Sequence, residues 1–104
     1  MNAVEVGKTQ ATRETTRIHK DLLSTIGVTL RSIRNERRLT LREVAEGAHI
    51  SVSYLAEIER GEKDPSSRVL ESVSEGLGIS AGELLRHIAD ELEPHAPTAK
   101  SIAA

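Results

Sequence analysis

The sequence predicts an all-α protein, a compact five-helix domain, from three observations. The chain has no Phe, no Trp and a single Tyr, so Leu, Ile, Val and Ala must fill its core, which suits small helices packed side by side. Its apolar residues recur at steps of three and four, and no alternating run is long enough to indicate a strand. With 104 residues, of which 38% are hydrophobic, the chain can build one core but not two.

The first helix is expected from about His19 to Arg37. Four apolar side chains share one face of it: Leu23, Ile26, Leu30 and Ile33. Residues 1–17 are rich in Thr, Ala, Gln and charge and have no sustained apolar period. We therefore expect them to form a disordered N-terminal arm.

The second helix is expected to begin at Leu41. Thr40 stands three residues before Glu43, the spacing of a capping box in which each side chain accepts a hydrogen bond from the other residue's backbone N–H. The apolar face of this helix is formed by Leu41, Val44, Ala45 and Ala48. The pattern then breaks over residues 47–50.

The third helix follows at once. Ser51 can cap it, and it is expected to run to about Arg60 and to stop at Gly61. A turn over residues 61–65 comes next. Either Ser66 or Ser67 can then cap a fourth helix, whose apolar residues are Val69, Leu70, Val73 and Leu77.

Gly76 and Gly78 are expected to end the fourth helix, and Ser80 to open the fifth. The fifth helix carries Leu84, Leu85, Ile88 and Leu92 at helical spacing, and Pro94 closes the structured part. The expected domain therefore spans residues 18–93, and residues 94–104 form a flexible C-terminal tail.

Several classes of protein are excluded by composition. The chain has no cysteine, no apolar run near the roughly 20 residues that cross a bilayer, and no leader-like N-terminus, so we expect a cytoplasmic protein associated with the nucleoid. No acid, base or nucleophile clusters, so an enzyme is the least favoured class, and no cofactor is expected. The four histidines, His19, His49, His87 and His95, are too scattered to indicate a metal site.

The charge is distributed unevenly, although its net value is only −2. Residues 1–42 hold nine Lys or Arg against four Asp or Glu, whereas residues 43–104 hold five against twelve. Five arginines lie within twelve residues: Arg31, Arg34, Arg37, Arg38 and Arg42. Such a density can neutralise phosphates, but a solvated basic helix end explains it equally well.

The second and third helices have the spacing of a helix-turn-helix. Two short helices that cross steeply after a brief turn leave room only for a very small residue at their contact, and Ala45 occupies that position. Such a pair can rest its first helix on the phosphate backbone of DNA. The start of its second helix then enters the major groove, where base edges are distinguishable.

The segments Leu39–Ala45 and Ile50–Gly61 resemble the XRE-type regulators, the Cro and lambda-repressor-like family. The resemblance covers about residues 26–90, including Pro65. Within that family, Leu39–Glu59 and Ser80–Ile88 are similar to the actinobacterial regulators of Clp protease genes called ClgR. Many members have Gly where this chain has His49, and Gln where it has Leu41, so Leu41 is not assigned the phosphate-holding role of that Gln.

The resemblance implies a lambda-repressor-like fold. It also implies a transcriptional regulator that binds double-stranded DNA sequence-specifically. Similarity to ClgR further implies an activator of Clp protease and related proteostasis genes, with RNA polymerase and Clp protease as partners. Repression and an antitoxin-like protein-interaction module with secondary DNA binding are the alternatives. The apolar end Ile102-Ala103-Ala104 is either a tag for Clp-type proteolysis or a frayed terminus.

Base contacts are expected from Val52, Ser53 and Glu57, which lie on the outer side of the third helix if Leu55 and Ile58 point inward. Val52 can touch a thymine methyl group, Ser53 can hydrogen bond several bases and Glu57 can accept from cytosine N4. Glu57 can equally be a surface acid that pairs with Arg60 or Lys63.

Phosphate contacts are expected from the arginine-rich region and from the motif. The candidates are Arg37, Arg38, Thr40, Arg42, Ser51, Tyr54, Arg60 and Lys63. Tyr54 can use its hydroxyl on phosphate or pack its ring against the second helix. For Glu59 the family resemblance implies a structural role, with Arg34 or Arg68 as its partner.

A homodimer is expected from the fifth helix, because four large apolar residues on a terminal helix exceed what a small domain readily covers: Leu84, Leu85, Ile88 and Leu92. The alternative is that they close the monomer core. A dimer would place two recognition helices one DNA turn apart, roughly 34 Å, and would require a near-palindromic promoter operator.

Overall fold

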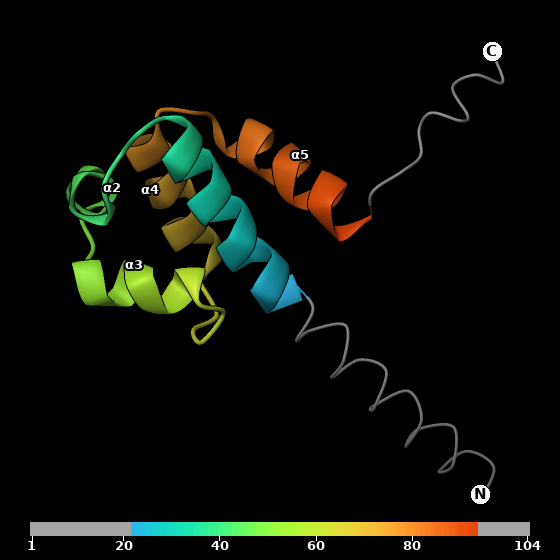
Figure 1. Ribbon diagram of the computed structural model, residues 1–104, viewed down its shortest axis with the longest axis horizontal. Coiled ribbons are helices and arrows are strands. Elements are labelled where there is room, and N and C mark those ends of the chain that lie inside the picture. The colour runs from blue at the N-terminus through green and yellow to red at the C-terminus, as the bar shows by residue number, and fades with distance from the viewer. Residues whose placement is uncertain (1–21, 94–104) are drawn as a thin grey trace, which may run out of the picture.

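The computed structural model describes residues 22–93 (Figure 1). A helix covering residues 22–36, here named the N-terminal helix, is followed by α2 (Leu41–Ala48), α3 (Val52–Glu59), α4 (Ser67–Leu77) and α5 (Ala81–Leu92). These residues contain no strand, and the predicted all-α, five-helix fold is confirmed. The expected arm of residues 1–17 and tail of residues 94–104 lie outside the described residues.

The helices surround one aliphatic core. Its buried members are Ile26, Leu30, Ile33, Val44, Ala45, Ala48, Leu55, Ile58, Val73, Leu77, Ile79, Leu84 and Ile88. In the N-terminal helix, Leu23 was expected in this core but is only half-buried, and Leu22 packs against the core instead. None of the helices in residues 22–93 is long and apolar enough to cross a membrane.

A hydroxyl side chain caps the start of each of the four labelled helices. The oxygens of Thr40, Ser51, Ser66 and Ser80 accept a hydrogen bond from the backbone N–H three residues on, at 3.0–3.2 Å. The predicted capping box and the predicted starts of α2 and α3 are confirmed. Of the two serines considered for α4, Ser66 is the cap.

Four helices end in the same left-handed motif. A residue one or two positions after each end has positive φ: Arg38 (58°), His49 (59°), Gly61 (76°) and Gly78 (80°). The next backbone N–H then donates to a carbonyl five residues back, as from Leu39 to Arg34 and from Ile50 to Ala45, both at 3.0 Å. Glycine adopts this conformation without penalty, whereas Arg38 and His49 carry a Cβ and are strained. These two residues flank α2.

Of the two glycines expected to end α4, Gly78 is its cap and Gly76 is not. Gly76 lies inside α4, which continues to Leu77 and ends at Gly78. A Cβ on Gly76 would lie 2.5 Å from the carbonyl oxygen of Val44, and one on Gly47 would lie 2.9 Å from the Cα of Gly76. Glycine is therefore needed at Gly76 for the close approach of α4 to α2. This is a packing requirement that local sequence does not reveal.

Candidate nucleic-acid interface

The outer side of α3 is open, as the sequence predicts. Leu55 and Ile58 face the core with at most 1% of their surface exposed, whereas Val52 is 38% exposed and Ser53 is also exposed. Glu57 is half-buried. The first turn of α3 contains no acidic residue, so no carboxylate of that turn opposes an anion at the positive end of the helix dipole.

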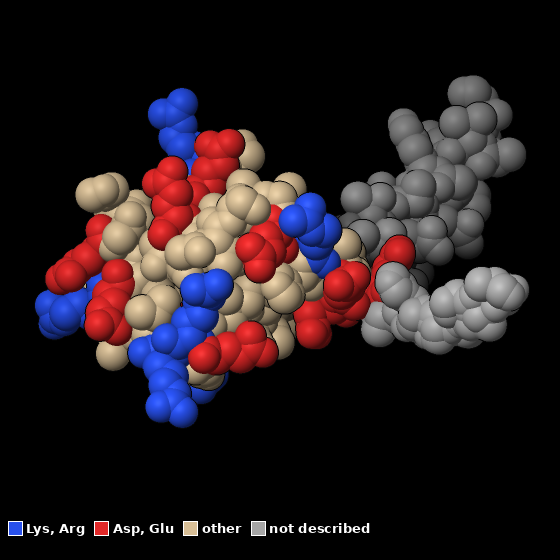
Figure 2. Space-filling model, turned by 90° about the horizontal axis from the view of Figure 1, so that it is seen from above, with Lys and Arg blue, Asp and Glu red and all other residues tan. Residues whose placement is uncertain are grey.

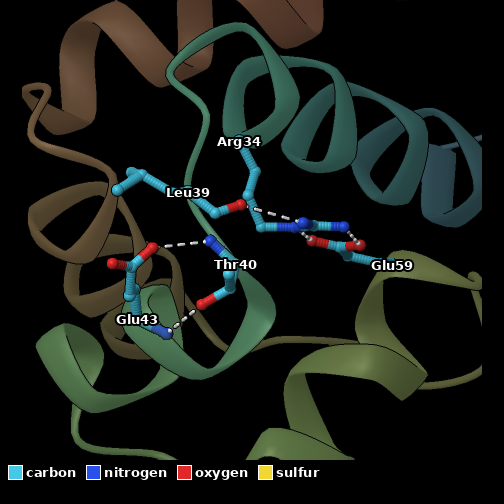
Figure 3. A network of polar contacts seen from close by, with 5 residues as sticks. All are labelled: Arg34, Leu39, Thr40, Glu43 and Glu59. Atoms are coloured by element: carbon cyan, nitrogen blue, oxygen red, sulfur yellow. Dashed lines mark hydrogen bonds and ion pairs between the residues drawn. The ribbon is translucent and has the colours of Figure 1, made fainter.

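A bidentate ion pair joins α3 to the N-terminal helix (Figure 3). Arg34 Nε lies 2.8 Å from Glu59 Oε2, and Arg34 Nη2 lies 3.0 Å from Glu59 Oε1. The Nη1 group of Arg34 also donates to the carbonyl oxygen of Leu39 at 3.0 Å. Arg34 therefore fixes the end of α3 and the segment that leads into α2. The partner of Glu59 is thus Arg34, and not Arg68, which is exposed.

The electrostatics of this pair follow from its burial. The Arg34 and Glu59 side chains are only 12% and 7% exposed. The hydrogen bonds that Arg34 donates to Glu59 raise the pKa of Arg34 above its ordinary value; burial opposes this rise, and the charge of Glu59 adds to it. Arg34 therefore stays charged, and the pair is a rigid and internally neutral part of the site.

The caps of α2 and α3 leave donors for a phosphate. In the capping box, the Thr40 N–H donates to Glu43 Oε1 at 2.8 Å and the Glu43 N–H donates to Thr40 Oγ1 at 3.0 Å (Figure 3). The Ser51 hydroxyl likewise accepts from the Tyr54 N–H at 3.0 Å. Both hydroxyl groups act as acceptors here, so each keeps its O–H to donate.

The predicted cationic contacts differ in their surroundings. Arg38, Arg42 and Lys63 are exposed. The Arg37 guanidinium lies 3.5 Å from where a Cβ on Gly78 would stand, at the carboxyl end of α4, where the helix dipole favours a cation. Arg37 is also exposed, and its guanidinium lies beside that helix end.

Arg60 is held by Glu62. Its guanidinium donates to both oxygens of that carboxylate, at 2.9 and 3.1 Å, and both side chains are more than half exposed. The hydrogen bond raises the pKa of Arg60 and lowers the pKa of Glu62. Arg60 is therefore hydrogen bonded to Glu62, and not to Glu57, the partner that the sequence suggested. A pair this exposed contributes little to stability, so Arg60 can exchange Glu62 for another anion.

Residues 30–84, just over half of the chain, match the model of a helix-turn-helix family. The chain belongs to this helix-turn-helix family. The two helices of the helix-turn-helix motif are α2 and α3. Ala45, which is 1% exposed, is the small residue at their contact. The predicted resemblance to XRE-type regulators and to ClgR is confirmed.

Three relatives place the chain among regulators. It is 44% identical over 61 residues to the immunity repressor of Bacillus phage phi105, across 59% of this chain and 42% of that protein. It is 42% identical over 60 residues to the transcriptional regulator ClgR of Mycobacterium tuberculosis, across 58% and 54%. The crystal structure of the clp gene regulator ClgR of Corynebacterium glutamicum matches with a TM-score of 0.65 and 38% identity, across 79% and 87%.

The matched segments span about half the length of the phage repressor and the mycobacterial regulator. All three relatives are named as regulators or as a repressor, which agrees with the expectation that this helix-turn-helix protein is not an enzyme.

The structure corrects half of the predicted dimerisation set. Leu84 and Ile88 are 0% and 6% exposed and belong to the core of the monomer. The exposed large apolar residues of α5 are Leu85 (56%) and Leu92 (38%). Another, Val28 (55%), lies on the N-terminal helix and was missed by sequence analysis. The apolar period of α5 does not reveal which of its edges faces the core, because that depends on how the helix is rotated.

Tyr54 is half-buried and packs against the core, as one of its two interpretations requires, and a contact from its hydroxyl to phosphate stays a prediction. Basic and acidic side chains are interspersed on the face seen in Figure 2, with acidic groups gathered toward the end of α5. The face seen there is therefore not a continuous basic surface.

Proposed function

We propose that this protein is a transcriptional regulator that binds a near-palindromic promoter operator as a homodimer. The single observation that carries the proposal is the exposed outer side of α3, held by the Arg34–Glu59 pair and flanked by the capped starts of α2 and α3. A helix start of this kind fits the major groove, and its neighbours fit the phosphate backbone.

The contacts divide into two kinds. Val52, Ser53 and Glu57 contact bases, because they occupy the outer side of α3. Phosphates are bound by the exposed cations and by the two capping hydroxyl groups, whose O–H groups are available.

The dimer is built on the exposed apolar residues Leu85 and Leu92 of α5. Two such side chains are costly to leave in water, and a second copy removes that cost. Twofold symmetry then sets the two α3 helices roughly 34 Å apart, one turn of DNA.

Similarity to two ClgR proteins supports activation of Clp protease and related proteostasis genes, with contacts to RNA polymerase and control by Clp protease. The relative from phage phi105 is named an immunity repressor, which supports repression as the second candidate. The sign of control depends on where the operator lies relative to RNA polymerase. A reporter fused to a Clp protease promoter distinguishes the two, since deletion of this protein lowers an activated promoter and raises a repressed one.

The test of DNA binding is fluorescence anisotropy with the purified protein on pooled promoter fragments and on scrambled duplex, at 50 and 200 mM salt. We expect Ser53→Ala to relax discrimination by about 1–3 kcal/mol at one base pair, and Arg42→Ala to weaken binding to all sequences and reduce its salt dependence. Arg86→Ala, a change of the same charge on an exposed residue of α5, is the control. Equal affinity for promoter fragments and scrambled duplex would refute sequence-specific regulation.

A further inference from the structure

The N-terminal helix meets the end of α3 along one of its sides (Figure 1). Gly27 is buried at this contact, where a Cβ on it would overlap the carbonyl oxygen of Glu59 and lie 2.7 Å from that of Ile58. Arg34 stands seven residues further on, so it lies on the same side of the helix, and it binds the carboxylate of Glu59. Glu59 is the last residue of α3, so one helix contacts both its main chain and its side chain.

The turn that follows α3 lies against the same helix. A Cβ on Gly61 would be 3.3 Å from the Cα of Ser24, which precedes Gly27 by three residues. The contact therefore runs from Ser24 through Gly27 to Arg34, along about three turns of the N-terminal helix. At Gly27 it is backbone against backbone, so no rotation of a side chain can make room for an added Cβ.

The closeness of this contact sets where α3 stands. Ordinary van der Waals contacts of a Cβ begin at 3.4 Å, so a methyl group on Gly27 would have to lengthen its 2.7 Å distance to the Ile58 oxygen to at least that value. The change exceeds the roughly 0.5 Å within which the residues of a binding site must be held. Because α3 has only eight residues, a displacement of its end also moves its outer side.

We infer that Gly27 is a positioning residue for base recognition, because its missing side chain lets α3 lie at the depth and angle at which its outer side faces the bases. The role rests on the proposed function, in which Ser53 and Glu57 contact bases from that side. Gly27 is buried and acts only through the backbone of α3. Long cationic side chains can follow a small displacement to a phosphate, whereas hydrogen bonds to bases weaken steeply with distance and angle. A displaced α3 should therefore lose discrimination between sequences and keep its general affinity for DNA.

The first measurement compares Gly27→Ala with Gly76→Ala, the same substitution against another backbone carbonyl, at the contact of α4 with α2. Anisotropy gives the affinity for promoter fragments and for scrambled duplex, in sucrose, which favours the folded state because it is excluded from the protein surface. Gly27→Ala should lower the ratio of the two affinities about tenfold, the loss of roughly one base contact. Gly76→Ala should keep the ratio, because it displaces α4 from α2 and not α3. A folded Gly27→Ala variant with the wild-type ratio would overturn the inference and leave the proposed function standing.

The second measurement needs no DNA. Tyr54 lies on α3 and packs against the core, and the chain has no other Tyr, no Trp and no Phe, so the near-UV circular dichroism comes from its ring alone. Gly27→Ala should change this signal and leave the far-UV spectrum helical, whereas Gly76→Ala should leave both unchanged. An unchanged Tyr54 signal in Gly27→Ala would overturn the inference.

Two further outcomes would also overturn it. Equal effects of the two variants would show a general loosening of the fold, and failure of Gly27→Ala alone to fold in sucrose would show that the glycine serves the fold as a whole. Equal affinity of the wild-type protein for promoter fragments and scrambled duplex would instead refute the proposed function. The Tyr54 signal would then decide by itself whether Gly27 sets the position of α3.

Discussion

One substitution at Arg38 should change the stability of the fold and its affinity for DNA in opposite directions. It occupies a left-handed position, φ 58°, in a motif that elsewhere in this fold uses Gly61 and Gly78. A left-handed residue with a Cβ costs about 1–2 kcal/mol. Replacement by glycine removes this strain, but glycine makes the unfolded chain more flexible, which costs about 0.5–1 kcal/mol of stability. Arg38→Gly should therefore raise the free energy of unfolding by about 0.5–1 kcal/mol, or the melting temperature by about 2–8 °C.

The same substitution should weaken binding to DNA. Arg38 is exposed, and we assign its guanidinium to a phosphate. Loss of one phosphate contact lowers the slope of log affinity against log salt by about 0.9 for each protomer. The assay pairs thermal denaturation followed by circular dichroism with anisotropy on an operator fragment at several salt concentrations.

Two controls separate the effects. His49→Gly relieves the same backbone strain, φ 59°, at a residue outside the assigned contacts, so it should raise stability and leave the salt slope unchanged. Arg38→Ala removes the charge but keeps the Cβ, so it should lower the slope without raising stability. An Arg38→Gly variant with an unchanged or lower melting temperature would refute the strain argument, and one with the wild-type slope would refute the phosphate contact.

Glu59→Gln leaves the charged guanidinium of Arg34 without its carboxylate in a site that is only about a tenth exposed. The free energy of unfolding, measured by urea titration, should therefore fall by about 2–3 kcal/mol. A loss below about 0.5 kcal/mol, the median for an exposed ion pair, would contradict this. Gly76→Ala should cost about 1–3 kcal/mol by forcing α4 away from α2, and an unchanged melting temperature would show that the helices adjust freely. Leu85→Asp should give a folded monomer in sedimentation equilibrium where the wild-type protein is a dimer; a dimer of this variant would place the interface elsewhere. The lowered pKa of Glu62 stabilises the fold above its ordinary value of 4.5, and this contribution is lost as pH falls below it. Glu62→Gln should therefore flatten the acid limb of melting temperature against pH slightly, and an unaltered limb would show that the pair with Arg60 has no effect.

The sequence by itself determined the parts that depend on neighbouring residues. The capping box of Thr40 and Glu43 and the serine caps are bonds across three residues, so spacing alone identifies them. The spacing around Ala45 likewise predicted the helix-turn-helix. The outer side of α3 followed from helical periodicity once Leu55 and Ile58 were assigned to the core.

Tertiary structure decided everything that depends on how the helices are placed against one another. Arg34 and Glu59 stand 25 residues apart, and only the crossing of the N-terminal helix with α3 brings their atoms to 2.8 Å. The burial of Leu84 likewise depends on the rotation of α5, and the close approach at Gly76 depends on the separation of α4 from α2. The backbone bonds of a helix start and end are local and follow from a few residues. Helix rotation and contact, by contrast, are set by packing over the whole core, to which distant residues contribute together.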